Sequence, residues 1–235
     1  MKNATWRYML AWAATLFVVI VASTFVHEIG HGIGAMVDGV HVSTGFNKIG
    51  MPGKTPADQD FRTGMPDGIW LGLLGPLMTW ALAIGATIVL YRLSRPTRLS
   101  FVMAALAVAN GLVRAAPMAI FLITALAGSL HMEDEVAWGI WIVTNILSPG
   151  LKGVARSEIP AGLLLSYPAV WIPPLLSLAI SLCCLIFAFR RIFRLEVGRL
   201  AHWGGRALVI VLALIAEFAK LPVINALDRV IRINW

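Results

Sequence analysis

YMLAWAATLFVVIVASTFVHEIGHGIGAMVD, residues 8–38, is the stretch that decides the fold of this chain. Its first part, residues 8–26, is apolar and close to the length of one membrane crossing, which takes about 20 residues. The apolar run leads directly into HEIGH, residues 27–31. The helical pattern extends to about Asp38, and Gly39 is a typical helix stop. The stretch therefore predicts one long helix that crosses a membrane and carries a polar motif.

Composition extends this interpretation to the whole chain. Of its 235 residues, 59% are hydrophobic and 13% are charged, whereas soluble domains are usually about 45–50% apolar and about 25% charged. The excess fits a surface that faces lipid, and the length fits one bundle of five or six spans. We therefore expect an all-α, polytopic transmembrane helical bundle that is integral to a plasma or inner membrane, with membrane lipids as its partners.

Further apolar stretches follow the first one and are separated by short polar segments. One of them, residues 136–147, is too short to cross a bilayer comfortably and is expected to be re-entrant or interfacial. Pro117 is expected to kink the third stretch. A short strand or hairpin is expected around residues 41–49 of the polar 40–68 loop. The remaining predicted spans are residues 69–90, 99–130, 161–189 and 208–226.

Lysine and arginine residues predict the orientation, since cytoplasmic segments of membrane proteins carry an excess of both. The net charge is +7, and the N-terminus, the 92–98 loop and the 190–206 loop hold ten basic residues against seven on the opposite side. This bias predicts a cytoplasmic N-terminus and a periplasmic or lumenal 40–68 loop. It also places His31 and residues 131–135 near the same membrane face.

Because the spans divide the basic residues, we expect no nucleic-acid partner.

Two histidines and a glutamate in the long helix have the spacing of a zinc site. His27 and His31 are four residues apart, so their Cβ atoms lie on one helix face about 5–6 Å apart. Neutral imidazoles at this spacing can bind Zn²⁺, and Glu28 can act as general base on the zinc-bound water. The alternative is a structural polar cluster without a metal. A charged side chain at mid-bilayer costs about 2.5–3.5 kcal/mol, so a buried Glu28 without a functional role is hard to explain. A catalytic zinc keeps one position open, so a third protein ligand is required.

Residues 27–40, HEIGHGIGAMVDGV, resemble the first motif of the site-2 protease family of intramembrane zinc metalloproteases, peptidase family M50. The family pattern has an alanine and a glycine that Ala35 and Gly39 match. Residues 67–78, DGIWLGLLGPLM, resemble the Gly-Pro-Leu segment that opens the family's second core helix. The resemblance covers about the first 130 residues and implies a core of three helices.

The resemblance also implies that the third metal ligand is an aspartate on or after the third helix. The family's usual Leu-Asp-Gly motif is absent from the third span, and Asp134, just beyond that span, is the best candidate. Its neighbours Glu133, Glu135 and His131 are alternatives. Asp67 is another, although it precedes the second span. The acidic residues could instead form a solvated cap at the start of the next helix, where negative charge suits the helix dipole.

Polar side chains within the other spans are further candidates, because ionisable residues inside a membrane are functional by default. Arg114 is predicted to pair with a carboxylate near the metal, and Asn110 to hold an extended substrate or a developing oxyanion. A structural hydrogen bond between helices is the alternative for both. Glu217 and Lys220 are three residues apart and are expected to pair with each other. Close helix packing is expected at three residues of the second span: Gly72, Gly75 and Pro76.

Together these features predict metal-assisted hydrolysis of peptide bonds in a transmembrane or membrane-associated protein substrate. Residues 1–135 form the predicted protease-like core, and residues 136–235 add membrane helices to the same domain. A substrate helix has to unwind before attack, and the 40–68 loop is expected to pair with it as an edge strand. One alternative is a catalytically inactive family member that binds membrane partners as a scaffold. The other is a zinc or solute transporter, for which no internal repeat is visible.

Overall fold

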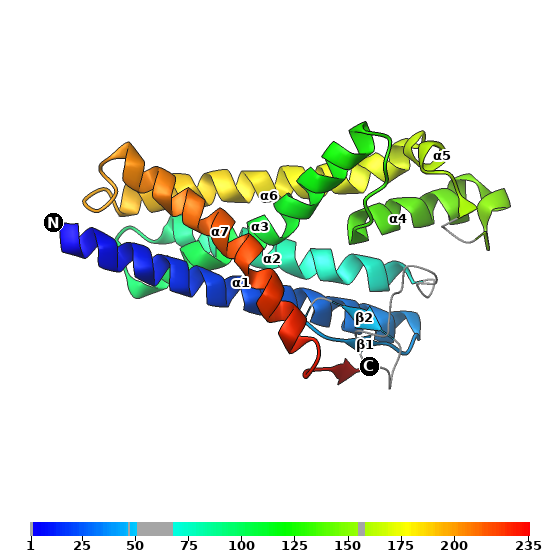
Figure 1. Cartoon of the computed structure of the whole chain (residues 1–235), viewed down its shortest axis with the longest axis horizontal. Coiled ribbons are helices and arrows are strands. Elements are labelled where there is room, and N and C mark those ends of the chain that lie inside the picture. The colour runs from blue at the N-terminus through cyan, green and yellow to red at the C-terminus, as the bar shows by residue number, and fades with distance from the viewer. Residues whose placement is uncertain (1, 47, 51–67, 155–157) are drawn as a thin grey trace.

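The computed structural model describes residues 2–46, 48–50, 68–154 and 158–235, and it is an all-α, polytopic membrane bundle (Figure 1). Of the described residues, 78% are helical, and they form seven α-helices. Five of these helices are long and apolar enough to cross a membrane, the lower of the two span numbers expected. They are α1 (Lys2–Asp38), α2 (Ile69–Arg92), α3 (Arg98–Leu126), α6 (Pro168–Leu195) and α7 (Trp203–Leu227).

Helix α1 continues through the HEIGH motif without interruption, as the sequence predicts. Its 37 residues correspond to about 55 Å of helix, well beyond the roughly 30 Å of a bilayer's hydrocarbon core. It ends where Gly39 adopts a φ of 70°, a left-handed conformation that glycine takes without a steric penalty. His27 and His31 therefore lie on the same continuous helix as the apolar stretch and not on a separate surface helix.

Helix α3 is the most buried of the five spans. It begins at a capping box in which the side chains of Thr97 and Ser100 bond to each other's backbone N–H groups. Pro117 lies inside the helix and does not end it. The helix stops at Leu126, earlier than expected, because Gly128 turns the chain with a φ of 78°. The acidic residues 133–135 follow, at the N-cap and in the first turn of the next helix.

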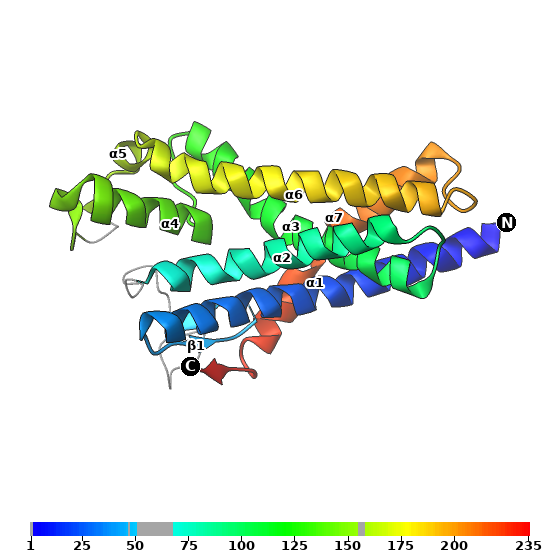
Figure 2. The same ribbon diagram turned by 180° about the vertical axis from the view of Figure 1, so that it is seen from behind.

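Spans α1 and α2 run side by side in both views, and the N-terminus lies at the opposite end of the bundle from the C-terminus (Figures 1 and 2). The α2–α3 and α6–α7 connections lie at the N-terminal end. The basic loops around 92–98 and 190–206 therefore share one end of the bundle, which is the grouping that the charge pattern predicts.

The short apolar stretch after α3 does not form a span. It folds as α4 (Asp134–Ile142), followed by a π-helical turn over Val143–Leu147, and it packs against α6 and α2 at the far end from the N-terminus. A further short helix, α5 (Ala161–Leu165), precedes α6. The expectation that this stretch does not cross the membrane therefore agrees with the structure.

A small sheet lies beside the C-terminal half of α1. Strands β1 (Ser43–Thr44) and β2 (Ile49–Gly50) form the expected antiparallel hairpin. Strand β3 (Ile233–Asn234), from the end of the sequence, pairs with the other edge of β1. Because β1 is the central strand, β2 is the outer strand that the 40–68 loop contributes to this sheet, and its pairing with a substrate remains a prediction. Residues 51–67 of the loop lie outside the described residues.

The main hydrophobic core joins all five spans, α1, α2, α3, α6 and α7. Trp12 is fully buried and its indole N–H donates to the Val209 carbonyl, 3.2 Å away, which ties α1 to α7. Within α7, Lys220 Nζ lies 2.5 Å from Glu217 Oε1, which confirms the expected pair. Small residues of α3 let its neighbours approach closely: Ala104, Ala105, Ala107 and Ala109 are all buried.

Candidate metal centre

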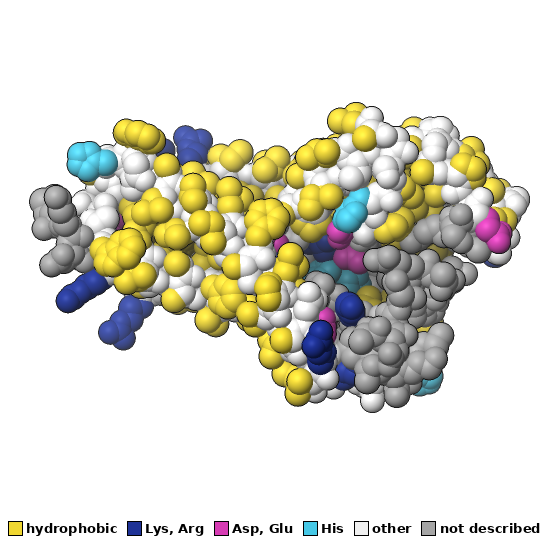
Figure 3. All heavy atoms as spheres, in the orientation of Figure 1, with side chains coloured by type: hydrophobic (Ala, Val, Ile, Leu, Met, Phe, Trp, Pro, Cys, Tyr) yellow, Lys and Arg dark blue, Asp and Glu magenta, His cyan; other side chains and the backbone are white. Residues whose placement is uncertain are grey.

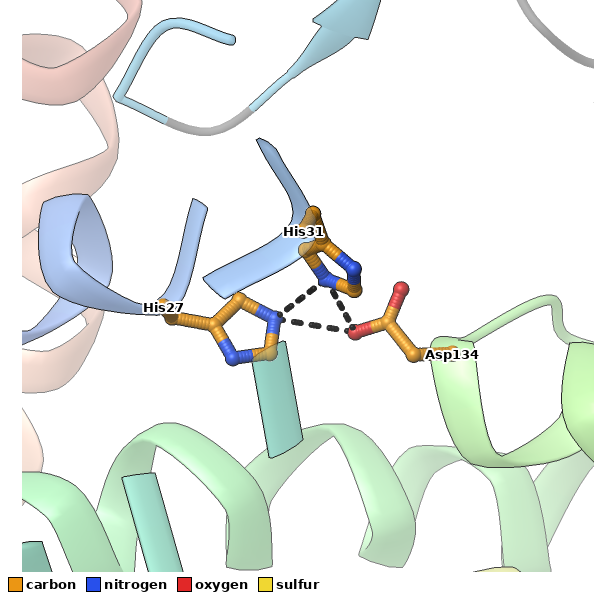
Figure 4. A group of neighbouring side chains, drawn as sticks. All are labelled: His27, His31 and Asp134. Atoms are coloured by element: carbon orange, nitrogen blue, oxygen red, sulfur yellow. Dashed lines mark hydrogen bonds and ion pairs between the residues drawn. The ribbon is translucent and has the colours of Figure 1, made fainter. Parts of the chain in front are cut away.

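Two imidazole rings face each other near the C-terminal end of helix α1. His27 and His31 are buried, their ring centroids lie 4.6 Å apart, and their Nε2 atoms are 3.0 Å apart. The sequence spacing accounts for this, since residues four apart occupy one helix face. Two potential metal-ligating nitrogens therefore converge on one point (Figure 4).

Asp134 reaches the same point from the first residue of α4. Its Oδ2 lies 2.9 Å from His27 Nε2 and 3.4 Å from His31 Nε2. Potential ligand atoms of the three residues all lie within 4.8 Å of one another. The structure thus brings together the three residues predicted as metal ligands, although 103 positions separate His31 from Asp134 in the sequence.

The spacing of these atoms suits zinc. A tetrahedral site with metal–ligand distances of 2.0–2.1 Å has neighbouring ligand atoms about 3.3–3.4 Å apart. The three distances between Nε2, Nε2 and Oδ2 are 2.9, 3.0 and 3.4 Å, so shifts of a few tenths of an ångström would accommodate the ion. Two imidazoles and one carboxylate are also a donor set that zinc accepts, with a fourth position left open.

A contact with the neighbouring helix orients the ring of His31. Its Nδ1 lies 2.5 Å from the backbone carbonyl of Leu71 in α2. A carbonyl only accepts, so Nδ1 carries a proton, and in the neutral form of the ring Nε2 presents its lone pair to the site. Metal-binding histidines are commonly fixed in this way by a partner on their other nitrogen. No sequence pattern indicates this partner, because it is a backbone group.

Glu28 contributes a buried carboxylate next to the histidines. It follows His27 directly, and its Oε2 has no hydrogen-bond partner among the described residues. Leaving a buried charged oxygen unpaired is costly. A general base needs a carboxylate oxygen that can accept a proton from water. Among the described residues, no donor occupies Oε2 of Glu28.

The neighbours of Asp134 favour the ionised form of its carboxylate. Burial by itself raises the pKa of Asp134, but the charge of His31 and hydrogen bonds to His27 and His31 outweigh burial and hold this pKa well below its usual range. The side chain keeps 19% of its surface exposed, and histidine and acidic side chains gather in a hollow of the surface in Figure 3. Water can therefore approach a site that lies between membrane helices.

The alternative third ligands lie elsewhere. Glu135 is buried, but its oxygens face Arg114 at 3.3 Å and the Ser177 hydroxyl at 2.6 Å. His131 is 42% exposed and lies 3.1 Å from Glu133. Asp67 lies outside the described residues. The acidic residues do begin α4, as the helix-cap alternative expects, but Arg114 covers them and they are not freely solvated.

The two polar residues of α3 for which roles are predicted, Arg114 and Asn110, differ in the contacts that they make. Arg114 Nη1 donates to Asp134 Oδ2 at 3.1 Å, which confirms the predicted pairing with a carboxylate beside the histidines. Asn110 Nδ2 donates to the Leu106 carbonyl, and its Oδ1 has no partner in the described part of the chain. Its predicted role toward substrate remains a prediction. Ser177, which the sequence reasoning missed, was visible only as an isolated hydroxyl in an apolar run.

Gly75 lets α2 approach the metal-site histidine. A Cβ built on Gly75 would lie 2.6–2.7 Å from carbon atoms of the His31 ring, and one on Gly30 would lie 2.7 Å from the Leu74 carbonyl oxygen. The close packing predicted at Gly75 is therefore confirmed. Gly72 is different, since a Cβ there meets no described residue within 4 Å. The described part of the chain therefore shows no close helix packing at Gly72, contrary to the prediction.

Replacing Gly75 with alanine is expected to destabilise the protein by about 1–3 kcal/mol, the usual cost of overpacking, and to weaken zinc binding by displacing His31. Gly72→Ala, on the same helix, is the matched control and should change stability by less than about 0.5 kcal/mol. Thermal unfolding in detergent and zinc titration would measure both. Equal behaviour of the two variants would contradict the close contact at Gly75.

Comparison of the chain with models of known protein families, with curated proteins and with solved structures gives no match in any of the three. The residues and their geometry therefore carry the functional conclusion.

Proposed function

We propose that the protein is an intramembrane zinc metalloendopeptidase that cleaves transmembrane or membrane-associated proteins. One observation carries the proposal: His27 and His31 of α1 meet Asp134 of α4 within 4.8 Å, beside the buried carboxylate of Glu28. Three protein ligands and one open position are the arrangement of catalytic zinc sites, whereas structural sites are usually closed by four protein ligands.

The residues around the site have different roles in the proposed hydrolysis. A bound zinc ion supplies Lewis-acid chemistry, because it polarises a carbonyl oxygen and lowers the pKa of water to about 7. His27, His31 and Asp134 hold the ion, and the Leu71 carbonyl keeps the His31 ring in place. Glu28 accepts the proton of the attacking water and passes it to the leaving amine, which completes cleavage of the amide bond.

The position of the site bears on the class of substrate. His27 and His31 lie within a span, so the scissile bond has to reach them at membrane depth or at its boundary. A transmembrane helix satisfies its amides internally and must unwind before one of them can be attacked. Segments that unwind easily at the membrane boundary are therefore the expected cleavage sites.

The sequence resemblance supports the same proposal. Residues 27–40 and 67–78 resemble the two motifs of the site-2 protease family, and they lie on α1 and at the start of α2, two helices that pack side by side. In this proposal α1, α2 and α3 form the catalytic core. Helices α6 and α7 complete the bundle around it.

The charge pattern supports a cytoplasmic N-terminus in a plasma or inner membrane. The end of the bundle that holds the N-terminus and the α2–α3 and α6–α7 connections carries ten basic residues. The segments predicted to lie on the opposite side carry seven in the sequence, and cytoplasmic segments are enriched in such residues. The metal site then lies toward the periplasmic or lumenal side, where α4 and the small sheet are found.

Removal of the metal is the first test. Purified protein in liposomes with a reporter transmembrane segment should cleave the reporter, lose this activity with a zinc chelator, and recover it when about one equivalent of Zn²⁺ is added. Cleavage that persists in the chelator would contradict the proposal. Stoichiometric zinc without cleavage of any membrane reporter would instead indicate the inactive, scaffolding alternative.

A further inference from the structure

Arg114 is a buried cation in the middle of the metal centre. It lies on α3 with only 2% of its surface exposed. Its Nη1 lies 2.9 Å from His27 Nε2 and 3.1 Å from Asp134 Oδ2. Its Nη2 lies 3.3 Å from Glu135 Oε2 and 3.7 Å from Glu133 Oε2. One guanidinium group thus contacts three consecutive carboxylates and one of the histidines.

Three neighbouring carboxylates at the start of α4 create a problem of ligand choice. Glu133, Asp134 and Glu135 are all acidic, and any of them could bind a metal ion that approaches His27 and His31. Nη2 of Arg114 holds the two flanking glutamates, and the Ser177 hydroxyl donates to Glu135 as well. Only Asp134 has an oxygen near both histidine nitrogens.

We propose that Arg114 is a positioning residue that selects Asp134 as the third zinc ligand by holding Glu133 and Glu135 away from the histidines. The inference rests on the proposed zinc site. The planar guanidinium suits this role because its five N–H groups form a fixed fork, which a lysine ammonium cannot reproduce. Nη1 has to leave the lone pair of His27 Nε2 when the ion binds, whereas the contacts of Nη2 with the glutamates can persist.

The charge of Arg114 and its positioning contacts predict opposite changes in zinc affinity when Arg114 is replaced. A positive charge this close to the ligands repels a dication, so loss of the charge alone would tighten zinc binding. Loss of the positioning contacts would weaken it, and removal of groups that orient ligands typically costs about 10- to 100-fold in metal affinity. The sign of the change therefore separates the two roles without reference to cleavage activity.

The experiment is a zinc titration of the purified full-length protein against a fluorescent chelator, with wild type, Arg114→Gln and Arg114→Lys. Both variants are expected to bind zinc about 10- to 100-fold more weakly than wild type. Arg191→Gln is the matched control, because Arg191 bonds to the Leu90 and Leu93 carbonyls and lies over the Tyr91 ring, at the opposite end of the bundle. This control should bind zinc as wild type does.

A double-mutant cycle shows whether Arg114 acts through Asp134. In an Asp134→Ala background, Arg114→Gln is expected to cause no further loss of zinc affinity, because the ligand that Arg114 selects is gone and Glu133 and Glu135 are released toward the histidines. Unchanged or tighter binding in Arg114→Gln, while wild type binds zinc, would overturn this inference and leave the zinc site intact. If Arg114→Gln does not fold, wild-type affinity in Arg114→Lys would overturn it equally. Absence of zinc from wild type would overturn both proposals.

Discussion

Replacement of Glu28 with glutamine is expected to lower the rate of substrate cleavage by about 10²- to 10⁴-fold, the usual contribution of a general base, while zinc stays bound. The amide keeps the size of the side chain but cannot accept the proton of the attacking water. Because Glu28 is not one of the three converging ligands, metal content should not change. The measurement is single-turnover cleavage of a membrane reporter, with zinc determined on the same preparation.

Glu217→Gln is the matched control for this experiment. Glu217 is also a buried glutamate within a span, and one of its oxygens likewise has no partner among the described residues, but it pairs with Lys220 of its own helix. The control should cleave as wild type does. If the Glu28 variant cleaves the reporter at the same rate as this control, Glu28 is not the base.

Replacement of Asp134 with alanine is expected to remove zinc from the purified protein, from about one ion per chain to a small fraction of that. His27→Ala should have the same result, because two remaining ligands hold zinc too weakly to survive dialysis. Metal analysis of the dialysed proteins is the measurement. These variants should also lose cleavage activity, but the zinc content is the primary readout.

His131→Ala tests the specificity of that loss. His131 lies in the same turn, three residues from Asp134, yet its ring is partly exposed and faces Glu133. It should retain zinc at the wild-type level. Retention of zinc by Asp134→Ala together with loss in His131→Ala would assign the third ligand to the histidine and contradict the geometry described above.

The residues of α1 could be predicted from the sequence because both of their determinants are local. An apolar run of the length of a membrane must be helical to satisfy its backbone, and the helix period then places His27 and His31 on one face. The same logic locates the other four spans and the stop at Gly39. The predicted end of α3 was less accurate, since helix ends depend on single turns such as that at Gly128.

The amino-acid sequence by itself determined the membrane bundle, the two histidines and the adjacent glutamate, because hydropathy and helical spacing act over a few turns. Only the tertiary structure decided which acidic residue joins them. That choice depends on the turn after α3, on the contacts of Arg114 with three carboxylates and on the Ser177 hydroxyl from α6. Glu133, Asp134 and Glu135 are chemically alike along the chain, and packing between distant helices is what makes their positions different.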